Sequence, residues 1–315
     1  HPAIPNSMPH DVLPPFVLKN GETFAMLDAR GEIHPDTHAD SGIFHRGTRH
    51  VSRLEWRMWG RPGAVLSSTE RGELGLQVSH LSNDDETVHL ERSTVLTPTA
   101  CLQQLTFTSF AQTSLQVPIT LHVDADFRDI FEVRGYQRPA RGRTVRTCTP
   151  EGLEAVYHGL DNTDRCTLVR LSGPVQEVDE ACLQLSLQLE PRRPRRLCVV
   201  LDFHPDGTRQ PPTPEAAFDA ALEAAVERFR EANRLAASVT TDNPAFNCWI
   251  ARSTSDVHLL SSQLDHGIYP YAGVPWFSCP FGRDGLITAR QLLLFEPRLA
   301  RGVLGFLAVS YTHLR

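Results

Sequence analysis

One 14-residue segment, residues 272–285, brings together side chains suited to binding a sugar. Its sequence AGVPWFSCPFGRDG combines aromatic residues, an arginine, an aspartate and glycines. A flat aromatic ring can cover the apolar C–H face of a pyranose, and an adjacent guanidinium and carboxylate can donate to and accept from neighbouring hydroxyls. We therefore expect this segment to bind carbohydrate through Trp276, Phe277, Phe281, Arg283 and Asp284.

The charged pair also has a purely structural interpretation. Arg283 and Asp284 lie where the loop is expected to become a helix. Unpaired backbone amides favour an aspartate at a helix N-terminus, so Asp284 could be an N-cap residue paired with Arg283. Local chemistry alone leaves both interpretations open.

Charge balance and lysine content exclude several classes of protein. The 315 residues include 31 basic and 37 acidic side chains, a formal net charge of −6. This acidic excess argues against a general nucleic-acid-binding protein. Lys19 is the single lysine, so a P-loop motif is absent, and pyridoxal chemistry would depend on a lysine in an expected β segment. We therefore expect no cofactor and no nucleic-acid partner.

Cysteine usage and hydropathy predict the compartment. Seven cysteines occur singly, several of them inside apolar stretches, and none forms a CxxC pair. This pattern is typical of reduced core cysteines in a reducing compartment. The sequence also has no apolar run of 18 residues and no signal-peptide pattern. A cytoplasmic protein without membrane contact is expected, and the oligomeric state is left open.

Four histidines, His34, His38, His45 and His50, lie close together in the sequence. A metal site would need them to converge, and spacing i, i+4 does this on a helix. A Pro-Asp step between the first two favours a turn instead. We therefore expect polar loop histidines and no metal.

Other charged clusters are expected to be structural. Arginines gather in residues 138–146 and 192–196. Without interleaved aromatics they are typical of solvated turns. Asp124, Asp126 and Asp129 lack the calcium-loop spacing and glycine of an EF-hand, so their pattern does not predict a calcium site.

The elements that position the aromatic segment begin with a large β region. Residues 12–205 contain short runs that alternate apolar and polar residues, with turn signals between them. Such runs predict antiparallel sheets packed as a sandwich, with one face in the core and the other in water. The clearest runs are residues 23–29, 73–81, 86–96, 101–110, 115–123, 181–189 and 196–203.

The period then changes to that of a helix. Thr213 before Pro214 predicts a helix start, and an amphipathic helix of about 20 residues follows. Its apolar face is Phe218, Leu222, Val226 and Phe229.

Further helices are expected over residues 244–264, 286–295 and 298–308. The first should turn five side chains inward, namely Phe246, Trp249, Ile250, Val257 and Leu260. Asp256 and Asp265 are expected to be helix-face or cap residues rather than ligands.

Four segments together resemble bacterial amylo-α-1,6-glucosidases of the glycogen-debranching type. Residues 270–293, PYAGVPWFSCPFGRDGLITARQLL, are similar to the family signature AGIPWF-x-x-x-FGRD. SGIFHRGTRHVSRLEW (41–56), DADFRDIFEVRGY (124–136) and VYHGLDN (156–162) are similar to stretches of the family's N-terminal domain. Gly47 departs from the pattern, which usually has an aspartate there. The polar contact that this aspartate would make within the sandwich or with the toroid is therefore in doubt.

The resemblance implies a multidomain β + α fold. It consists of an N-terminal antiparallel β-sandwich over residues 1–205, a linker helix over 206–240, and the first helices of an incomplete (α/α)6 toroid over 241–315. A complete toroid has twelve helices, so the chain is expected to be truncated at its C-terminal end. Residues 309–315 fit the preceding helix poorly and are suspected not to be native sequence.

The resemblance also implies roles for the aromatic segment. Arg283 and Asp284 would bind the non-reducing-end glucose in the −1 subsite, with Trp276 and Phe277 lining the pocket. An inverting glycosidase needs two carboxyl groups about 6.5–9.5 Å apart. In this family both come from later in the toroid, so no catalytic residue is expected before Arg315.

The expected function is therefore the N-terminal portion of a glycoside hydrolase acting on α-glucans. The whole protein would use acid/base hydrolysis with inversion, and this portion would be inactive and only marginally soluble. Two alternatives stay open. One is a non-catalytic carbohydrate-binding or interaction β module, and the other is a toroid glycosidase of different linkage specificity, trehalase-like or glucosylglycerate-type.

Overall fold

The computed structural model describes most of the chain. Some of the expected features, His38, the start of the linker and residues 313–315, lie outside the described residues. The described ranges are 15–36, 39–149, 152–179, 182–203 and 212–312.

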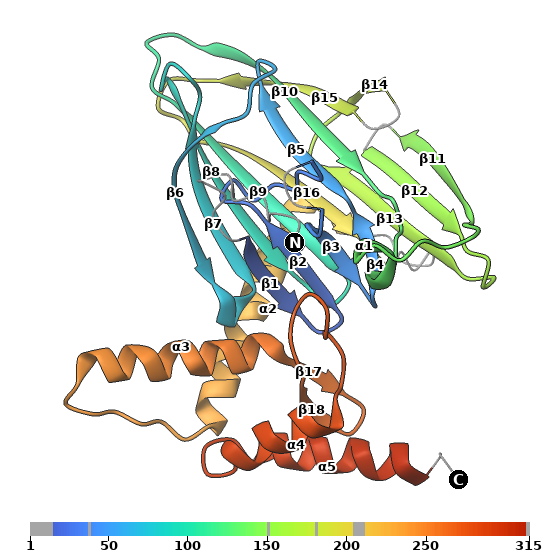
Figure 1. Cartoon of the computed structure of the whole chain (residues 1–315). Coiled ribbons are helices and arrows are strands. Elements are labelled where there is room, and N and C mark those ends of the chain that lie inside the picture. The colour runs from blue at the N-terminus through green and yellow to red at the C-terminus, as the bar shows by residue number, and fades with distance from the viewer. Residues whose placement is uncertain (1–14, 37–38, 150–151, 180–181, 204–211, 313–315) are drawn as a thin grey trace, which may run out of the picture.

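The β region contains three antiparallel sheets, drawn from blue to yellow in Figure 1. The largest sheet runs in the order β11 (Arg143–Thr149), β12 (Gly152–His158), β13 (Asp164–Leu171), β16 (Arg195–Asp202), β9 (Ala100–Ser109), β8 (Val88–Leu96), β7 (Leu76–Ser82) and β6 (Ala64–Arg71). The second has the order β14 (Gln176–Asp179), β15 (Cys182–Leu189), β10 (Leu115–Asp124) and β5 (Arg53–Met58). The third is β1 (Phe16–Asn20), β2 (Thr23–Leu27), β3 (Gly42–His45) and β4 (Thr48–Val51).

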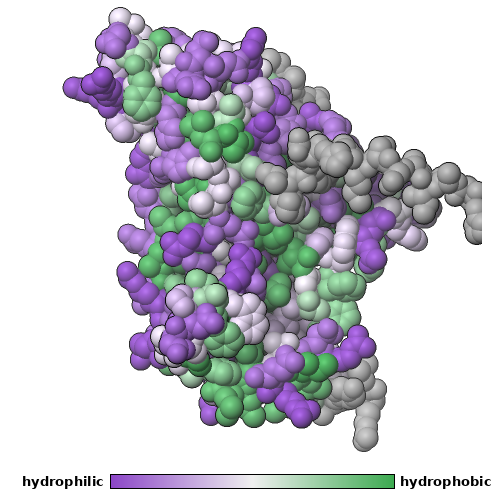
Figure 2. Space-filling view, turned by 60° about the vertical axis from the view of Figure 1, so that its left-hand side comes forward, coloured by the Kyte–Doolittle hydropathy of each residue, from purple (hydrophilic) through white to green (hydrophobic). Residues whose placement is uncertain are grey.

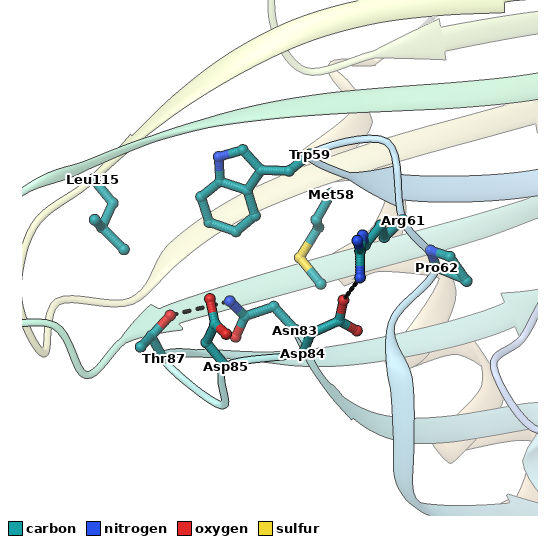
Figure 3. Close-up of a pocket in the computed structure, with 9 residues that line it drawn as sticks. All are labelled: Met58, Trp59, Arg61, Pro62, Asn83, Asp84, Asp85, Thr87 and Leu115. Carbon is teal, nitrogen blue, oxygen red and sulfur yellow. Dashed lines mark hydrogen bonds and ion pairs between the residues drawn. The ribbon is translucent and has the colours of Figure 1, made fainter.

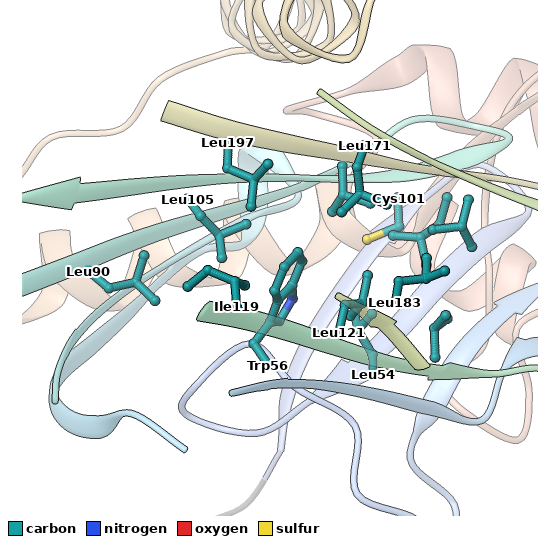
Figure 4. Close-up of a cluster of buried hydrophobic side chains, with 14 of the residues drawn as sticks. Leu54, Trp56, Leu90, Cys101, Leu105, Ile119, Leu121, Leu171, Leu183 and Leu197 are labelled. Atoms are coloured by element: carbon teal, nitrogen blue, oxygen red, sulfur yellow. The ribbon is translucent and has the colours of Figure 1, made fainter. Parts of the chain in front are cut away.

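The main core lies between the largest sheet and the second sheet (Figure 4). Leu105 and Leu197 from the first face Trp56 and Ile119 from the second, and all four are at most 3% exposed. The register places Ile119 opposite Leu185 on β15. Alternating apolar residues therefore form the antiparallel β architecture that the sequence predicts.

The expectation that one face of every strand meets water is wrong for the centre of the largest sheet. Helix α2 (Pro214–Leu235) covers its outer face, and Phe218 packs there with Leu102 and Val200. Strands β9 and β16 are therefore buried on both faces over residues 100–103 and 197–201. The helix begins as predicted, because the hydroxyl of Thr213 accepts a hydrogen bond from the Ala216 amide.

The segment after α2 is not wholly helical, because a β-hairpin separates two of its helices. Its elements follow in the order α3 (Pro244–Leu260), the hairpin β17 (Ser261–Leu264) and β18 (Gly267–Pro270), α4 (Gly282–Gln291) and α5 (Pro297–Thr312). Two short helices, η1 (Gly72–Leu74) and α1 (Ile130–Val133), belong to the β region.

Two expectations for this part are corrected. The helix expected to reach Leu264 ends at Leu260, because residues 261–270 form the hairpin, and its turn contains Asp265. Phe246 and Trp249 are 43% and 63% exposed rather than buried. Among the described residues the helices do not close a ring, so the toroid stays a prediction.

Two further expectations fail for single side chains. His45 and His50 are buried in β3 and β4, where neighbouring strands cover them, and are not loop residues. All seven cysteines are free, but Cys248 and Cys279 are exposed rather than in a core. Within the described ranges, every helix is either too short or too polar to cross a membrane.

Candidate functional site

The aromatic segment forms a closed loop between β18 and α4. Gly273 and Phe277 exchange two backbone hydrogen bonds of 3.1 and 3.0 Å, so Trp276 lies in the tip that they close. The rings of Phe277 and Phe281 meet edge to face, with centroids 5.7 Å apart. Both rings are exposed, at 49% and 39%, so the loop presents an aromatic surface to solvent.

Tyr269 fixes where this loop ends and α4 begins. Its hydroxyl donates a 2.9 Å hydrogen bond to the carbonyl of Phe281. Gly285 lies so close to the tyrosine that an added Cβ would be 2.5 Å from the hydroxyl oxygen. Burial, together with the charge of Asp284, raises the pKa of Tyr269. The tyrosine therefore stays protonated and keeps its hydrogen bond.

The cap interpretation of Asp284 is wrong. The N-cap of α4 is Phe281, which makes no side-chain cap bond, and Asp284 lies inside the first helical turn. Its carboxylate is 4.0 Å from the guanidinium of Arg283, whose side chain is 85% exposed. An ion pair this long and this exposed contributes little to stability. The pair is therefore available to a ligand.

Trp276 contacts the β region. Its ring lies 5.3 Å from the guanidinium carbon of Arg134, the residue that ends α1. A capping box between Asp129 and Glu132 fixes α1, and the Ile130 amide donates to the carbonyl of Gly47. Arg134 was not identified from the sequence as a site residue, although it lies in the FEVRG stretch that carries part of the resemblance.

Gly47 is suited to its position without any side chain. Arg46 and Gly47 have φ values of 48° and 75° in the turn between β3 and β4. Two successive residues with positive φ make the tight hairpin turn that favours glycine. The missing aspartate is therefore replaced by a turn that still contacts α1 through its backbone.

A buried polar cluster lies behind the loop, at the contact between the β region and the helices. Lys19 donates a 2.6 Å hydrogen bond to Ser262, and its ammonium lies 4.5 Å from the ring centroid of Tyr271. The Tyr271 hydroxyl donates to Glu22. Burial lowers the pKa of Lys19 to about 8, with Glu22 opposing it, and burial and Glu22 raise the pKa of Tyr271. These residues carry no sequence motif, and they were missed.

The other charged clusters are structural. Asp126 forms a bidentate pair with the buried Arg49, Asp129 caps α1, and Asp124 pairs with Arg146. Arg138 pairs with Asp129. The arginines of 138–146 are thus partly neutralised by the preceding acidic segment, rather than being free in solvent.

His34 and His50 have separate surroundings. His34 lies within 3.4 Å of carboxylate oxygens from three residues, Asp28, Glu32 and Glu55. His50 instead lies 3.1 Å from the hydroxyl of Thr167. The described histidines of this group therefore do not converge on one point.

The five predicted sugar-binding residues share one loop and helix start, but they form an open surface. Two large cavities lie elsewhere in the described part of the chain. One of about 490 Å³ is at the edge of the sandwich (Figure 3). The other, about 560 Å³, is an apolar cleft between α2, α3 and residues 292–299. Figure 2 shows hydrophobic surface mixed with polar surface toward the helical end of the molecule, where Trp249 and Leu294 are exposed.

Comparisons with known proteins give a family and a fold. A family model described as the N-terminal domain of (some) glycogen debranching enzymes matches residues 18–200. A bacterial glucoamylase complexed with acarbose is similar with a TM-score of 0.54 and 8% identity, over 90% of this chain and 48% of that one. A putative kojibiose phosphorylase from the human microbiome has a TM-score of 0.45 and 11% identity, over 78% and 36%.

The chain thus spans about half or less of these two structures. A putative aldose 1-epimerase from Escherichia coli K12 has a TM-score of 0.37 and 8% identity, over 60% of this chain and 98% of that one. No curated protein matches the chain. At 8% identity the glucoamylase likeness shows a shared fold.

Proposed function

Because the chain belongs to the family defined by the N-terminal domain of some glycogen debranching enzymes, we propose that it is part of a glycoside hydrolase acting on α-glucans. The family match over residues 18–200 is the observation that carries this proposal. The specific activity proposed is that of an amylo-α-1,6-glucosidase, which removes glucose at branch points. The shared fold with a glucoamylase over most of this chain supports a hydrolase architecture.

In this proposal Arg283 and Asp284 bind the terminal glucose. The guanidinium donates to one sugar hydroxyl and the carboxylate accepts from its neighbour. Trp276, Phe277 and Phe281 cover the apolar face of the ring. Two observations support this assignment. The ion pair between Arg283 and Asp284 is long and exposed, so it contributes little to stability, and the aromatic rings beside it are exposed.

Hydrolysis itself is assigned to carboxyl groups outside these residues. One would protonate the leaving oxygen and the other would activate water, with inversion at the anomeric carbon. The proposed division is a β-sandwich over residues 1–205, a linker helix over 206–240 and the beginning of an (α/α)6 domain over 241–315. We further propose a cytoplasmic location and no cofactor.

Calorimetric titration of maltotriose into the chain tests the binding site. Asp284→Ala should weaken binding at least about tenfold, because a charge-assisted hydrogen bond contributes about 1.5–3 kcal/mol. Asp265→Ala is the matched control, since this exposed carboxylate lies in the nearby hairpin turn. Equal affinities for the wild type and Asp284→Ala would contradict the assignment, and glucose release from branched dextrin by this chain would contradict the placement of catalysis.

A carbohydrate-binding β module is the second candidate, because the family match itself covers the β region. That function predicts binding that Asp284→Ala leaves unchanged. A toroid hydrolase of another linkage specificity predicts the same loss of affinity in Asp284→Ala as the main proposal. The reason is that Arg283 and Asp284 would contact the terminal glucose and not the leaving group. Comparing maltotriose, isomaltotriose and trehalose as ligands separates the α-1,4, α-1,6 and α,α-1,1 linkages.

A further inference from the structure

The cavity at the edge of the sandwich, away from the helices, is lined by side chains of several chemical types. It has a volume of about 490 Å³ and lies between the β5–β6 turn and the β7–β8 loop (Figure 3). This is within the usual range of small-molecule sites, about 300–1,000 Å³. Its lining combines apolar, aromatic and charged side chains, and none of them belongs to the proposed glucose site.

An exposed tryptophan on a well-defined turn lies over this cavity (Figure 3). Met58 and Arg61 exchange backbone hydrogen bonds of 2.9 and 3.0 Å across a two-residue turn. The turn residues Trp59 and Gly60 have φ values of 49° and 75°. A bulky residue with positive φ is rare and costs conformational energy. The Trp59 amide also donates to the carbonyl of Pro118 at 3.1 Å, so the backbone that carries this 40% exposed side chain is fixed in place.

The facing wall presents hydrogen-bonding groups of fixed orientation. In Figure 3 the indole of Trp59 lies on one side of the cavity and Asn83, Asp85 and Thr87 lie on the other. The Asn83 amide donates to the Thr87 hydroxyl at 3.0 Å and accepts from the Val88 amide at 2.8 Å. These bonds fix the loop, and the exposed carboxylate of Asp85 faces the cavity.

A guanidinium beside these groups completes the lining. Arg61 pairs with Asp84 across the mouth of the cavity. The two aspartates and one arginine give a net charge of −1, which disfavours phosphates and other anions. The carboxylates equally disfavour a wholly apolar ligand. A ligand with an apolar face and several hydroxyls can use all of these groups, because the indole covers the face while Asp85 accepts from the hydroxyls and Arg61 donates to them.

We infer that this cavity is a second carbohydrate-binding site, in which Trp59 stacks on a pyranose ring and Asp85 and Arg61 bind its hydroxyls. The sugar class follows from the lining. The identity of the sugar as a glucosyl unit of an α-glucan rests on the proposed function.

The site is separate from the loop that contains Asp284. Strand β6 runs from Ala64, beside the cavity, to Arg71, which is followed by η1. There Glu73 accepts a hydrogen bond from Ser255 of α3 at 3.1 Å. Eight residues of strand extend about 25 Å, and in Figure 1 α4, which contains Asp284, lies on the far side of α3 from the sandwich. One short oligosaccharide therefore cannot occupy both sites. A branched polymer can, and two linked contacts raise its apparent affinity.

Hydrogen exchange with maltoheptaose as the probe tests this inference on the whole chain. Bound sugar should slow amide exchange in residues 58–63 and 83–87. Trp59→Ala should weaken binding at this site about tenfold and reduce that protection accordingly, since it removes the aromatic face that covers the pyranose ring. Trp59→Phe should restore most of it. Trp249→Ala is the matched control, because this tryptophan is 63% exposed on α3.

Asp284→Ala separates this inference from the proposed function. If the second site exists, protection of residues 58–63 persists in that variant. Protection near residue 284 without any at 58–63 would overturn the inference and leave the proposed function intact. Unchanged protection at 58–63 in Trp59→Ala, with an unaltered melting temperature, would also overturn it. A second variant, Asp85→Asn, should weaken binding at this site without loss of stability, because its side chain is exposed.

Discussion

His34 is a single side chain that balances several buried charges. Its imidazole nitrogens lie 3.4, 3.2 and 3.2 Å from carboxylate oxygens of Asp28, Glu32 and Glu55. Glu32 is 1% exposed and also pairs with the buried Arg92. The carboxylates of Asp28 and Glu32 raise the pKa of His34 to about 10, against the opposing effect of burial. The imidazolium is therefore the charged form at neutral pH.

Replacing this cation should change stability and its pH dependence. His34→Gln is expected to lower the free energy of unfolding by about 2 kcal/mol at pH 6, because carboxylates lose a partner while still buried. The stabilisation by His34 is complete below pH 6.5 and is lost as pH rises toward 10, since the folded pKa is the higher one. Urea unfolding at pH 6 and pH 10 should therefore show the two proteins converging.

His158→Gln is the control for this comparison. His158 pairs with Asp164 at 2.9 Å, but its side chain is 51% exposed. An exposed pair contributes little, so this variant should follow the wild-type pH profile. A constant stability difference between the wild type and His34→Gln from pH 6 to pH 10 would contradict the role of the imidazolium.

At the scale of elements, helix α4 is positioned by one close contact. Gly285 packs against Tyr269, whose hydroxyl in turn bonds the carbonyl that precedes the helix. Tyr269 belongs to β18, and α5 packs on the same tyrosine through Phe306, with ring centroids 5.0 Å apart. The strand therefore sets the direction in which Arg283 and Asp284 are presented.

Gly285→Ala should disturb this contact. The added methyl would be 2.5 Å from the tyrosine oxygen, and overpacking of this kind costs about 1–3 kcal/mol. We expect a lower melting temperature and weaker maltotriose binding. Tyr269→Ala removes both the oxygen and the ring carbon that would lie 2.8 Å from the added methyl, so the double variant should lose less stability than the sum of the two single variants. Strict additivity in this double-mutant cycle would show that the contact does not position α4.

The strands themselves were easier to predict from the sequence than the distant elements that pack against them. Strand runs such as 101–110 and 115–123 were found because alternation is a local pattern. The burial of His45 and the exposure of Trp249 were not, because they depend on which distant elements cover each side chain. The contact of Trp276 with Arg134 joins residues far apart in the chain. Local motifs identified the loop but not its partner.

At the scale of the whole molecule, the β region and the helices meet through polar groups. The single lysine of the chain is buried at this contact, 3% exposed, and bonds Ser262 of β17. The neighbouring bond from Tyr271 to Glu22 crosses the same boundary. Because Tyr271 directly precedes the aromatic loop, the β region holds the loop from behind, and Arg134 contacts it from α1.

The protonation of Lys19 should report the integrity of this contact. Its pKa is lowered from 10.5 to about 8 by burial, so between these values the unfolded chain binds more protons than the folded one. Stability should therefore rise by about 2 kcal/mol as pH increases from 8 to 10.5, measured relative to Lys19→Met, which lacks the titrating group. Because the chain has one lysine, biosynthetic incorporation of ¹³C-lysine labels this side chain alone, and an NMR titration reads its pKa directly. A midpoint near 10.5 would show that Lys19 is solvated and that the two regions do not pack through it. Glu22→Gln should lower the midpoint further, because it removes the charge that favours the ammonium.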